Sequence, residues 1–173
     1  FVAPVSQSAP RKTLPAGNYP ARCYQMVMMG THDEEFQGEK KTLNKIWLGW
    51  EFPTKLDTFQ EGKEPQPYTM GKEYTFSMKE KSSFRQALES RRGRKFTDQQ
   101  AYEFNSGTLL GVTCLINVQA YTKKSGEEGV KVGSISPMIE GMVLPDAINP
   151  ILAFSLIDPD WQVFETLPSF LQD

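Results

Sequence analysis

The sequence has very few of the residues from which metal and catalytic sites are built. Its 173 residues include one histidine, His32, and two cysteines, Cys23 and Cys114. None of the three has another histidine or cysteine at the spacing of a metal-ligand set. GxSxG, GxGxxG and phosphate-loop motifs are also missing. These absences favour a binding protein over an enzyme, and they predict that the chain carries no metal and no cofactor.

Long hydrophobic runs are missing as well. No segment approaches the ~18 consecutive apolar residues that a membrane-spanning helix needs, and residues 1–10 lack the charged and apolar regions of a secretory signal. The two cysteines lie within strand-like segments and are expected to be buried thiols. We therefore expect a soluble protein of a reducing cytoplasm.

Basic residues are missing from the end of the chain. Residues 132–173 contain six acidic residues and no Lys or Arg, whereas the preceding part holds all 19 basic and 15 of the 21 acidic residues. The body therefore has a net charge of +4 and the end one of −6. The two parts are expected to attract different partners, unless both are ordinary solvated surface.

Alternating hydrophobicity predicts a mainly β protein. The predicted strands are 19–28, 43–52, 73–79, 112–121 and 130–136, with a loop at 30–41, a strand end at Pro53 and a long connection at 54–70. Two capping-box patterns predict a helix near 82–92 and a shorter one at 97–105. Five strands with a helix between the third and fourth is the element order of the five-stranded Greek-key barrel known as the OB-fold. A generic β-sandwich is the alternative.

Composition divides the chain into three parts. Residues 1–16 are rich in Pro, Ser and Ala and are expected to form a mobile arm. Residues 17–140 form the predicted barrel, and residues 141–173 form an acidic tail with several aromatic residues and prolines. Within the tail, residues 160–167 could form about two helical turns, because no proline interrupts them.

The strand at 43–52 offers a surface on which a nucleic-acid base could stack. Its apolar side chains alternate, so Lys45, Trp47, Gly49 and Glu51 fall on the opposite, solvated face. A tryptophan next to a cation, with a glycine providing clearance, suits base stacking. The alternative is that Trp47 packs under the connection 54–70.

Other strands have similar faces. Polar, basic or aromatic side chains share one face in the remaining strands, and the candidates among them are Arg22, Tyr24, Lys79, Tyr121 and Lys123. The helical region adds a cluster of cations: Arg85, Arg91, Arg92, Arg94 and Lys95. Stabilisation of the helix dipole would account for Arg91 and Arg92. Phosphate contact is the interpretation that also covers the two residues beyond Gly93.

Four segments resemble a family of small tailed-phage proteins, some of which look like OB-fold single-stranded DNA-binding proteins. The segments are LPAGNYPARCY at 14–24, LESRRGRKFT at 88–97, LLGVTCLINV at 109–118 and DPDWQVFETLP at 158–168. The sequence departs from the family pattern at 26–29, where an acidic residue would be expected before the glycine. The resemblance implies a protein of the host bacterial cytoplasm that protects single-stranded DNA in replication and recombination.

The resemblance also implies a role for the tail. In such proteins an acidic tail recruits phage or host replication and recombination proteins, and here Trp161, Phe164 and Phe170 would make that contact. The alternative is that the tail folds back over an open barrel edge or the binding groove. The oligomeric state stays open, with a dimer among the options. Two rival functions are a phage-encoded inhibitor of a host defence system and a metal-dependent nuclease using the acidic run at 33–35.

Overall fold

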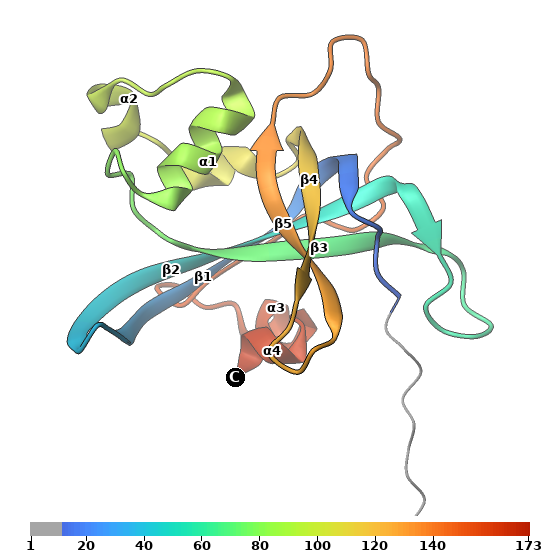
Figure 1. Ribbon diagram of the computed structural model, residues 1–173, viewed down its shortest axis with the longest axis horizontal. Coiled ribbons are helices and arrows are strands. Elements are labelled where there is room, and N and C mark those ends of the chain that lie inside the picture. The colour runs from blue at the N-terminus through green and yellow to red at the C-terminus, as the bar shows by residue number, and fades with distance from the viewer. Residues whose placement is uncertain (1–11) are drawn as a thin grey trace, which may run out of the picture.

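The computed structural model describes residues 12–173, which form a curled, mainly β structure (Figure 1). Five strands lie in the order β3-β2-β1-β4-β5, each antiparallel to its neighbours, and a sixth pairs in parallel with β1. The strands are β1 (Gly17–Phe36), β2 (Glu39–Asp57), β3 (Gln66–Thr75), β4 (Thr113–Thr122), β5 (Glu128–Ser136) and β6 (Leu152–Ser155). The end strands β3 and β5 contact each other but are not hydrogen-bonded neighbours, so the sheet is barrel-like and open.

The core is formed by the alternating apolar residues that the sequence predicts. In β2, Ile46, Leu48, Trp50 and Phe52 are all buried, with at most 3 % of each exposed. Burying side chains of this size contributes about 1.5–3 kcal/mol each. The predicted inward face of this strand is confirmed. On the opposite face Trp47 is partly exposed, whereas Gly49 and Glu51, which were predicted to be solvated, are buried.

The predicted loop at 30–41 is wrong, because β1 and β2 continue through it as a long hairpin. The acidic run of β1 lies opposite the lysines of β2, with Glu34 paired to Lys41 and Glu35 to Lys40. Opposite charges across an antiparallel pair stabilise the strands even where both faces are solvated. The tight turn uses Gln37 and Gly38, both with positive φ.

The ends of β2 and β3 also differ from the prediction. Pro53 does not end β2, because the ladder is interrupted between Phe52 and Leu56 and then resumes. Proline has no N–H group to donate, but at such an irregularity the sheet loses no hydrogen bond because of it. Strand β3 begins within the predicted connection and ends at Thr75, so the expected strand at 73–79 is displaced toward the N-terminus.

Both predicted helices are present, but the pattern Ser83-Phe84-Arg85-Gln86 places the first cap one residue too late, and the second helix ends at Tyr102 and not near residue 105. In α1 (Ser83–Arg92), the Ser82 side chain accepts a hydrogen bond from the Arg85 N–H, and Gly93 ends the helix with a φ of 72°. In α2 (Asp98–Tyr102), Thr97 forms a capping box. A 3-10 helix, η1 (Ser106–Leu109), precedes β4. Helix α1 packs its buried side chains against β3 and β5.

The C-terminal segment packs on the sheet and provides the sixth strand. It contains β6, α3 (Trp161–Thr166) and α4 (Ser169–Gln172), and lies below the strands in Figure 1. Val27, Phe154 and Leu167 form a second small core between this segment and β1. The predicted helical turns at 160–167 are confirmed, whereas β6 makes the prediction of five strands wrong.

Part of the expected N-terminal arm is also packed against the body. Leu14 is 4 % exposed, and the Lys12 ammonium lies 2.8 Å from an Asp57 carboxylate oxygen. The rest of the arm, residues 1–11, lies outside the described residues. Within residues 12–173, no helix is long and apolar enough to cross a membrane.

Candidate ligand-binding groove

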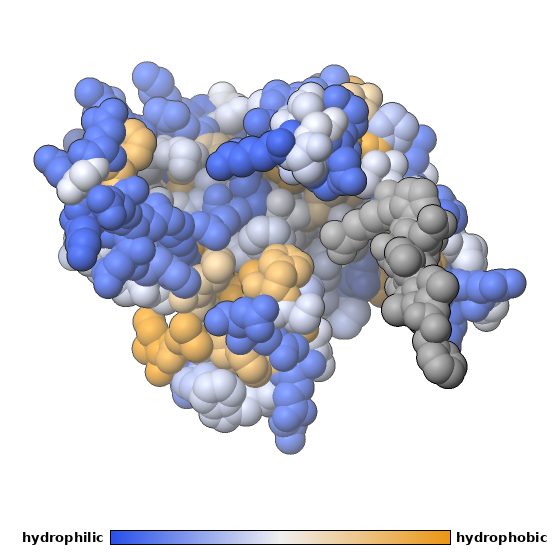
Figure 2. Space-filling view, turned by 60° about the horizontal axis from the view of Figure 1, so that its bottom comes forward, coloured by the Kyte–Doolittle hydropathy of each residue, from blue (hydrophilic) through white to orange (hydrophobic). Residues whose placement is uncertain are grey.

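A groove of about 770 Å³ runs along the outer face of the first three strands. Three aromatic residues predicted to face outward meet in it: Tyr24 of β1, Trp47 of β2 and Tyr121 of β4. Residues of β3 line one side, and the β4–β5 hairpin and the C-terminal segment line the other. Figure 2 shows this side of the molecule, with apolar side chains gathered over the C-terminal segment. Side chains from three separate strands therefore form one surface.

Trp47 is held in place by its contact with a glycine and by a hydrogen bond. Its ring lies across β3 at Gly71, where an added Cβ would come within 2.1 Å of the indole Cζ2 atom. The indole Nε1 donates a hydrogen bond of 3.2 Å to the Gln25 side-chain oxygen. A glycine at position 71 is therefore a condition for the observed position of this ring.

The C-terminal segment covers part of the same tryptophan. The ring of Phe170 meets Trp47 edge-on, with centroids 5.2 Å apart and an interplanar angle of 69°. Pro168 lines the groove next to it. The prediction that Trp47 packs under residues 54–70 is therefore replaced by a contact with residue 170, which folds back onto the groove.

The charged residues lining the groove within the described chain are Lys12 and Lys131. The Lys131 ammonium lies 5.7 Å from the Tyr121 ring centroid, within the range of a cation–π interaction. Lys12 binds Asp57, whose pKa is lowered to about 2 by hydrogen bonds from Lys12, Tyr68 and the Thr58 N–H. Lys131 therefore places positive charge at the groove, whereas the charge of Lys12 is paired with that of Asp57.

A buried carboxylate holds the segment that leads into β6. Glu51 is fully buried and accepts hydrogen bonds from the Ile148 N–H at 3.1 Å and the Asn149 N–H at 2.8 Å. The Arg22 guanidinium lies 3.7 Å from the same carboxylate and donates a hydrogen bond to the Pro145 carbonyl. This arrangement positions Asn149 in the groove wall and engages Arg22, a predicted DNA contact, within the protein.

The other predicted strand residues have separate surroundings. Lys45 binds Glu34 and Glu73, and these hydrogen bonds raise its pKa. Burial raises the pKa of Tyr24, whose side chain is partly covered. Lys123 is exposed and lies 4.0 Å from Glu127, and Lys79 is exposed beyond the end of β3. None of the three lysines lines the groove in the described structure.

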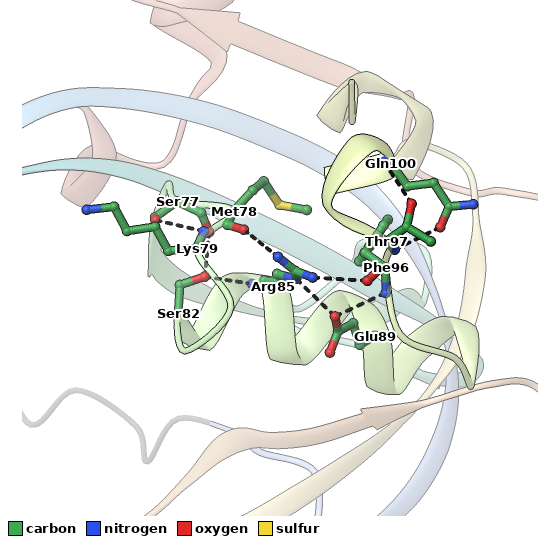
Figure 3. Close-up of polar contacts among 9 residues, drawn as sticks. All are labelled: Ser77, Met78, Lys79, Ser82, Arg85, Glu89, Phe96, Thr97 and Gln100. Carbon is green, nitrogen blue, oxygen red and sulfur yellow. Dashed lines mark hydrogen bonds and ion pairs between the residues drawn. The ribbon is translucent and has the colours of Figure 1, made fainter. Parts of the chain in front are cut away.

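Arg85 is a structural residue, and the prediction that it contacts phosphate is not supported by its position. Its guanidinium is buried and donates to the Met78 and Phe96 carbonyls at 3.2 and 3.0 Å and to Glu89 at 3.0 Å (Figure 3). Glu89 also accepts from the Phe96 N–H, and these bonds lower its pKa. Arg85 therefore joins the two ends of the helical region.

The remaining helical cations also lie outside the groove. Arg91, in the last turn of α1, is partly buried, and its Nε atom has no hydrogen-bond partner among the described residues. The Arg92 guanidinium lies 4.2 Å from the Phe96 ring centroid. Arg94 and Lys95 are exposed beyond the end of α1. The sequence shows that these cations cluster but not on which side of the barrel they lie.

Several groove residues carry no strong signal in the sequence. Tyr68 and Phe59 pack edge-on, 5.0 Å between centroids, at the end of the groove near β3. Lys12 belongs to the segment expected to be a mobile arm. The alternation of Pro67, Thr69 and Gly71 with larger residues is the signal that residues 66–71 form a strand with one open face.

The single histidine and the two cysteines belong to no group of potential metal ligands within residues 12–173. No group of three or more His, Cys, Asp or Glu side chains is placed to hold a metal ion there. The ring Nε2 of His32 lies 2.9 Å from the Met29 carbonyl oxygen. Burial raises the pKa of Cys23 and of Cys114 to about 12.

Neither the protein-family models nor the curated proteins compared with this sequence give a match. The geometry of the groove is therefore the basis for a functional assignment.

Proposed function

We propose that this protein binds single-stranded DNA in the groove and does so without catalysis. The observation that carries the proposal is the convergence of Tyr24, Trp47 and Tyr121, from three strands, on one groove whose charged lining residues are lysines. Stacking on aromatic side chains suits every base, and lysines next to them suit the phosphate backbone. The combination is the one that a sequence-tolerant single-strand site needs.

Stacking would supply most of the affinity. A base stacked on an aromatic side chain contributes about 1–3 kcal/mol. Gly71 lets the indole ring of Trp47 lie directly against the backbone of β3, so the ring is held in a fixed position on which a base can stack. The amide and hydroxyl groups of Gln25, Thr69 and Asn149 line the same surface and can meet base edges or sugars through hydrogen bonds.

The topology supports assignment of the barrel to the OB-fold. In the order β3-β2-β1-β4-β5, the end strands approach each other, and α1 lies between β3 and β4 in the sequence and packs on β3 and β5. The OB-fold binds oligonucleotides on the face of its second and third strands. The groove lies over β2 and β3, where that comparison would place the ligand.

The cellular role follows from the resemblance to tailed-phage proteins. On this proposal the protein covers single-stranded DNA during phage replication and recombination in the bacterial cytoplasm. Its C-terminal segment would contact replication or recombination proteins through its exposed side chains, of which Trp161 and Phe170 are 60 % and 56 % exposed. Phe164 packs instead on Phe154, with ring centroids 5.4 Å apart.

A titration with fluorescent oligonucleotides tests the proposal. We expect single-stranded DNA to bind more tightly than duplex DNA of the same length, and Trp47→Ala to weaken binding about 5- to 150-fold, as loss of one stacked base predicts. Tyr102→Ala, which removes a 92 % exposed aromatic side chain of α2 outside the groove, is the matched control. Equal affinity of wild type and Trp47→Ala would refute the proposed site.

A protein-binding inhibitor of a host defence system is the second candidate function. One observation favours it: the groove already accommodates a peptide of the chain itself, with Pro168 and Phe170 in its wall. Salt distinguishes the two functions. Two phosphate contacts by Lys12 and Lys131 would each contribute about −0.7 to the slope of log K against log salt, so binding should weaken about 7-fold between about 50 and 200 mM. A contact made by aromatic side chains should change little over this range.

A further inference from the structure

An exposed apolar surface with an acidic rim lies on the C-terminal segment. Ile157 is 89 % exposed, Trp161 60 % and Leu156 49 %. The acidic residues Asp158 and Glu165 are exposed beside them. Figure 2 shows the apolar side chains gathered over this segment. We call these five residues the C-terminal patch; packing of the segment on β1 fixes its position.

A second surface combines exposed apolar and basic residues at the end of α1. Arg94 and Lys95 are exposed and form no ion pair within residues 12–173. A Cβ added at Gly93 would lie 3.2 Å from the Pro137 ring, so the residues after β5 run beside this helix end. One of them, Ile139, is 59 % exposed, and the exposed Glu140 follows it. Arg94, Lys95 and Ile139 form what we call the helical patch, and with Glu140 at its edge the patch still has a net positive charge.

The two patches are complementary in character and lie on opposite sides of the sheet. In Figure 1, α1 and the segment that follows β5 lie above β2 and β3, and α3 lies below them. Because the sheet separates the two patches, one molecule cannot bring them together. Exposed apolar surfaces with charged rims are typical of protein–protein contact sites, and opposite charges on the two partners fix which surfaces meet.

We propose that the C-terminal patch of one copy of this protein binds the helical patch of the next. Charge supports a second copy as the partner: the C-terminal patch carries the exposed acidic residues Asp158 and Glu165, and the helical patch carries the exposed basic residues Arg94 and Lys95. The contact joins two different surfaces, so its repetition produces a ring or an open chain of copies and not a closed two-fold dimer. The proposal does not depend on what the groove binds.

Sedimentation velocity tests self-association directly. We expect the weight-average sedimentation coefficient of the wild-type protein to rise with concentration at low salt. The rise should diminish as salt increases, because the screening length falls from about 10 Å at 0.1 M to about 3 Å at 1 M. A wild-type protein that stays monomeric at low salt and high concentration would overturn the proposal.

A charge-swap experiment tests which surfaces meet. One variant reverses the C-terminal patch (Asp158→Lys with Glu165→Lys), and the other reverses the helical patch (Arg94→Glu with Lys95→Glu). Each variant alone should remain monomeric, because its two patches then carry the same sign. An equimolar mixture should associate again, since each reversed patch now matches the reversed patch of the other variant. Failure of the mixture to associate, while the wild type does, would place the contact elsewhere and overturn the proposal.

Two further variants serve as control and as a probe of proximity. Reversal of the exposed neighbours Lys123 and Lys124 changes the charge equally outside both patches and should leave association intact. For proximity, an Ile157→Cys protein mixed with an Ile139→Cys protein should form a cross-linked heterodimer with a short bis-maleimide reagent. Neither variant alone should do so, because the native cysteines are buried, with pKa values raised to about 12. Equal cross-linking of a single variant with itself would contradict the proposed contact.

Discussion

Replacing Phe170 by alanine should tighten the binding of single-stranded DNA. Its ring lies edge-on against Trp47, where a base would stack, so a bound strand must displace it. Phe170 is 56 % exposed, which leaves less than half of its side chain buried. About 90 Å² of contact, at about 25 cal/mol per Å², corresponds to about 2 kcal/mol. Removing this competitor should therefore lower the Kd by up to about 30-fold.

Trp161→Ala is the matched control for this experiment. Trp161 is an aromatic residue of the same segment with a similar exposed fraction, 60 %, but it contacts Phe164 and not Trp47. We expect its Kd for a labelled oligonucleotide, measured by fluorescence anisotropy at low protein concentration, to stay within about twofold of the wild-type value. If Phe170→Ala left the Kd unchanged while Trp47→Ala raised it, Phe170 would not compete with the ligand and the reasoning would be refuted.

Three further predictions concern stability, packing and reactivity. Glu51→Ala should lower the free energy of unfolding by about 3–5 kcal/mol in a urea titration, because it removes a buried carboxylate that binds two backbone N–H groups and faces an arginine; a loss below about 1 kcal/mol would contradict this account. Gly71→Ala should displace the ring of Trp47, which a shift of its fluorescence emission would report; an unchanged spectrum would show that the ring is not held there. Cys23 and Cys114 should resist iodoacetamide in the native protein at about pH 8 and react in urea, because their folded pKa values of about 12 keep the buried thiols protonated; rapid native alkylation would contradict the observed burial.

The parts of the fold predicted correctly are those where burial enforces a pattern. In β2, every second residue from Ile46 to Phe52 enters the core, so the period of two is visible in the sequence. Thr97 marks the start of α2, and the pair Ser82-Ser83 locates the start of α1 to within one residue, because serine and threonine side chains are favoured as helix caps. For these elements, the residues within the segment itself are sufficient to predict the secondary structure.

The parts that the sequence does not predict depend on contacts with no local pattern. The hairpin at 30–41 is solvated on both faces, so its polar sequence looks like that of a loop although Glu34 and Glu35 pair with lysines across it. Strand β6 has four residues, too few to show a period, and exists because β1 offers it a free edge. Both elements form because they pair with a strand elsewhere in the sheet, and a local sequence pattern does not show that pairing.

The candidate site is predictable in its aromatic residues and not in its charges. Strand faces follow from sequence parity, so the alternation alone assigns Tyr24, Trp47 and Tyr121 to outer faces. The position of a cation relative to the groove depends instead on how segments pack, as Arg85 and Lys12 show. Arg85 is enclosed by residues of the helical region, and Lys12 is brought to the groove by a segment expected to be mobile.

Pairing of β6 with β1 has a consequence for the order in which the molecule assembles. Gln25 and Leu152 are neighbours in the sheet although more than a hundred residues separate them in the chain. Closing so long a loop costs more conformational entropy than closing the β1–β2 hairpin, and contacts of high sequence separation form late. The C-terminal segment contributes only a small second core, so we expect it to open at a lower free energy than the barrel core. Hydrogen exchange at residues 152–155 should therefore be faster than in the centre of β2, and the barrel can persist while this segment detaches and returns.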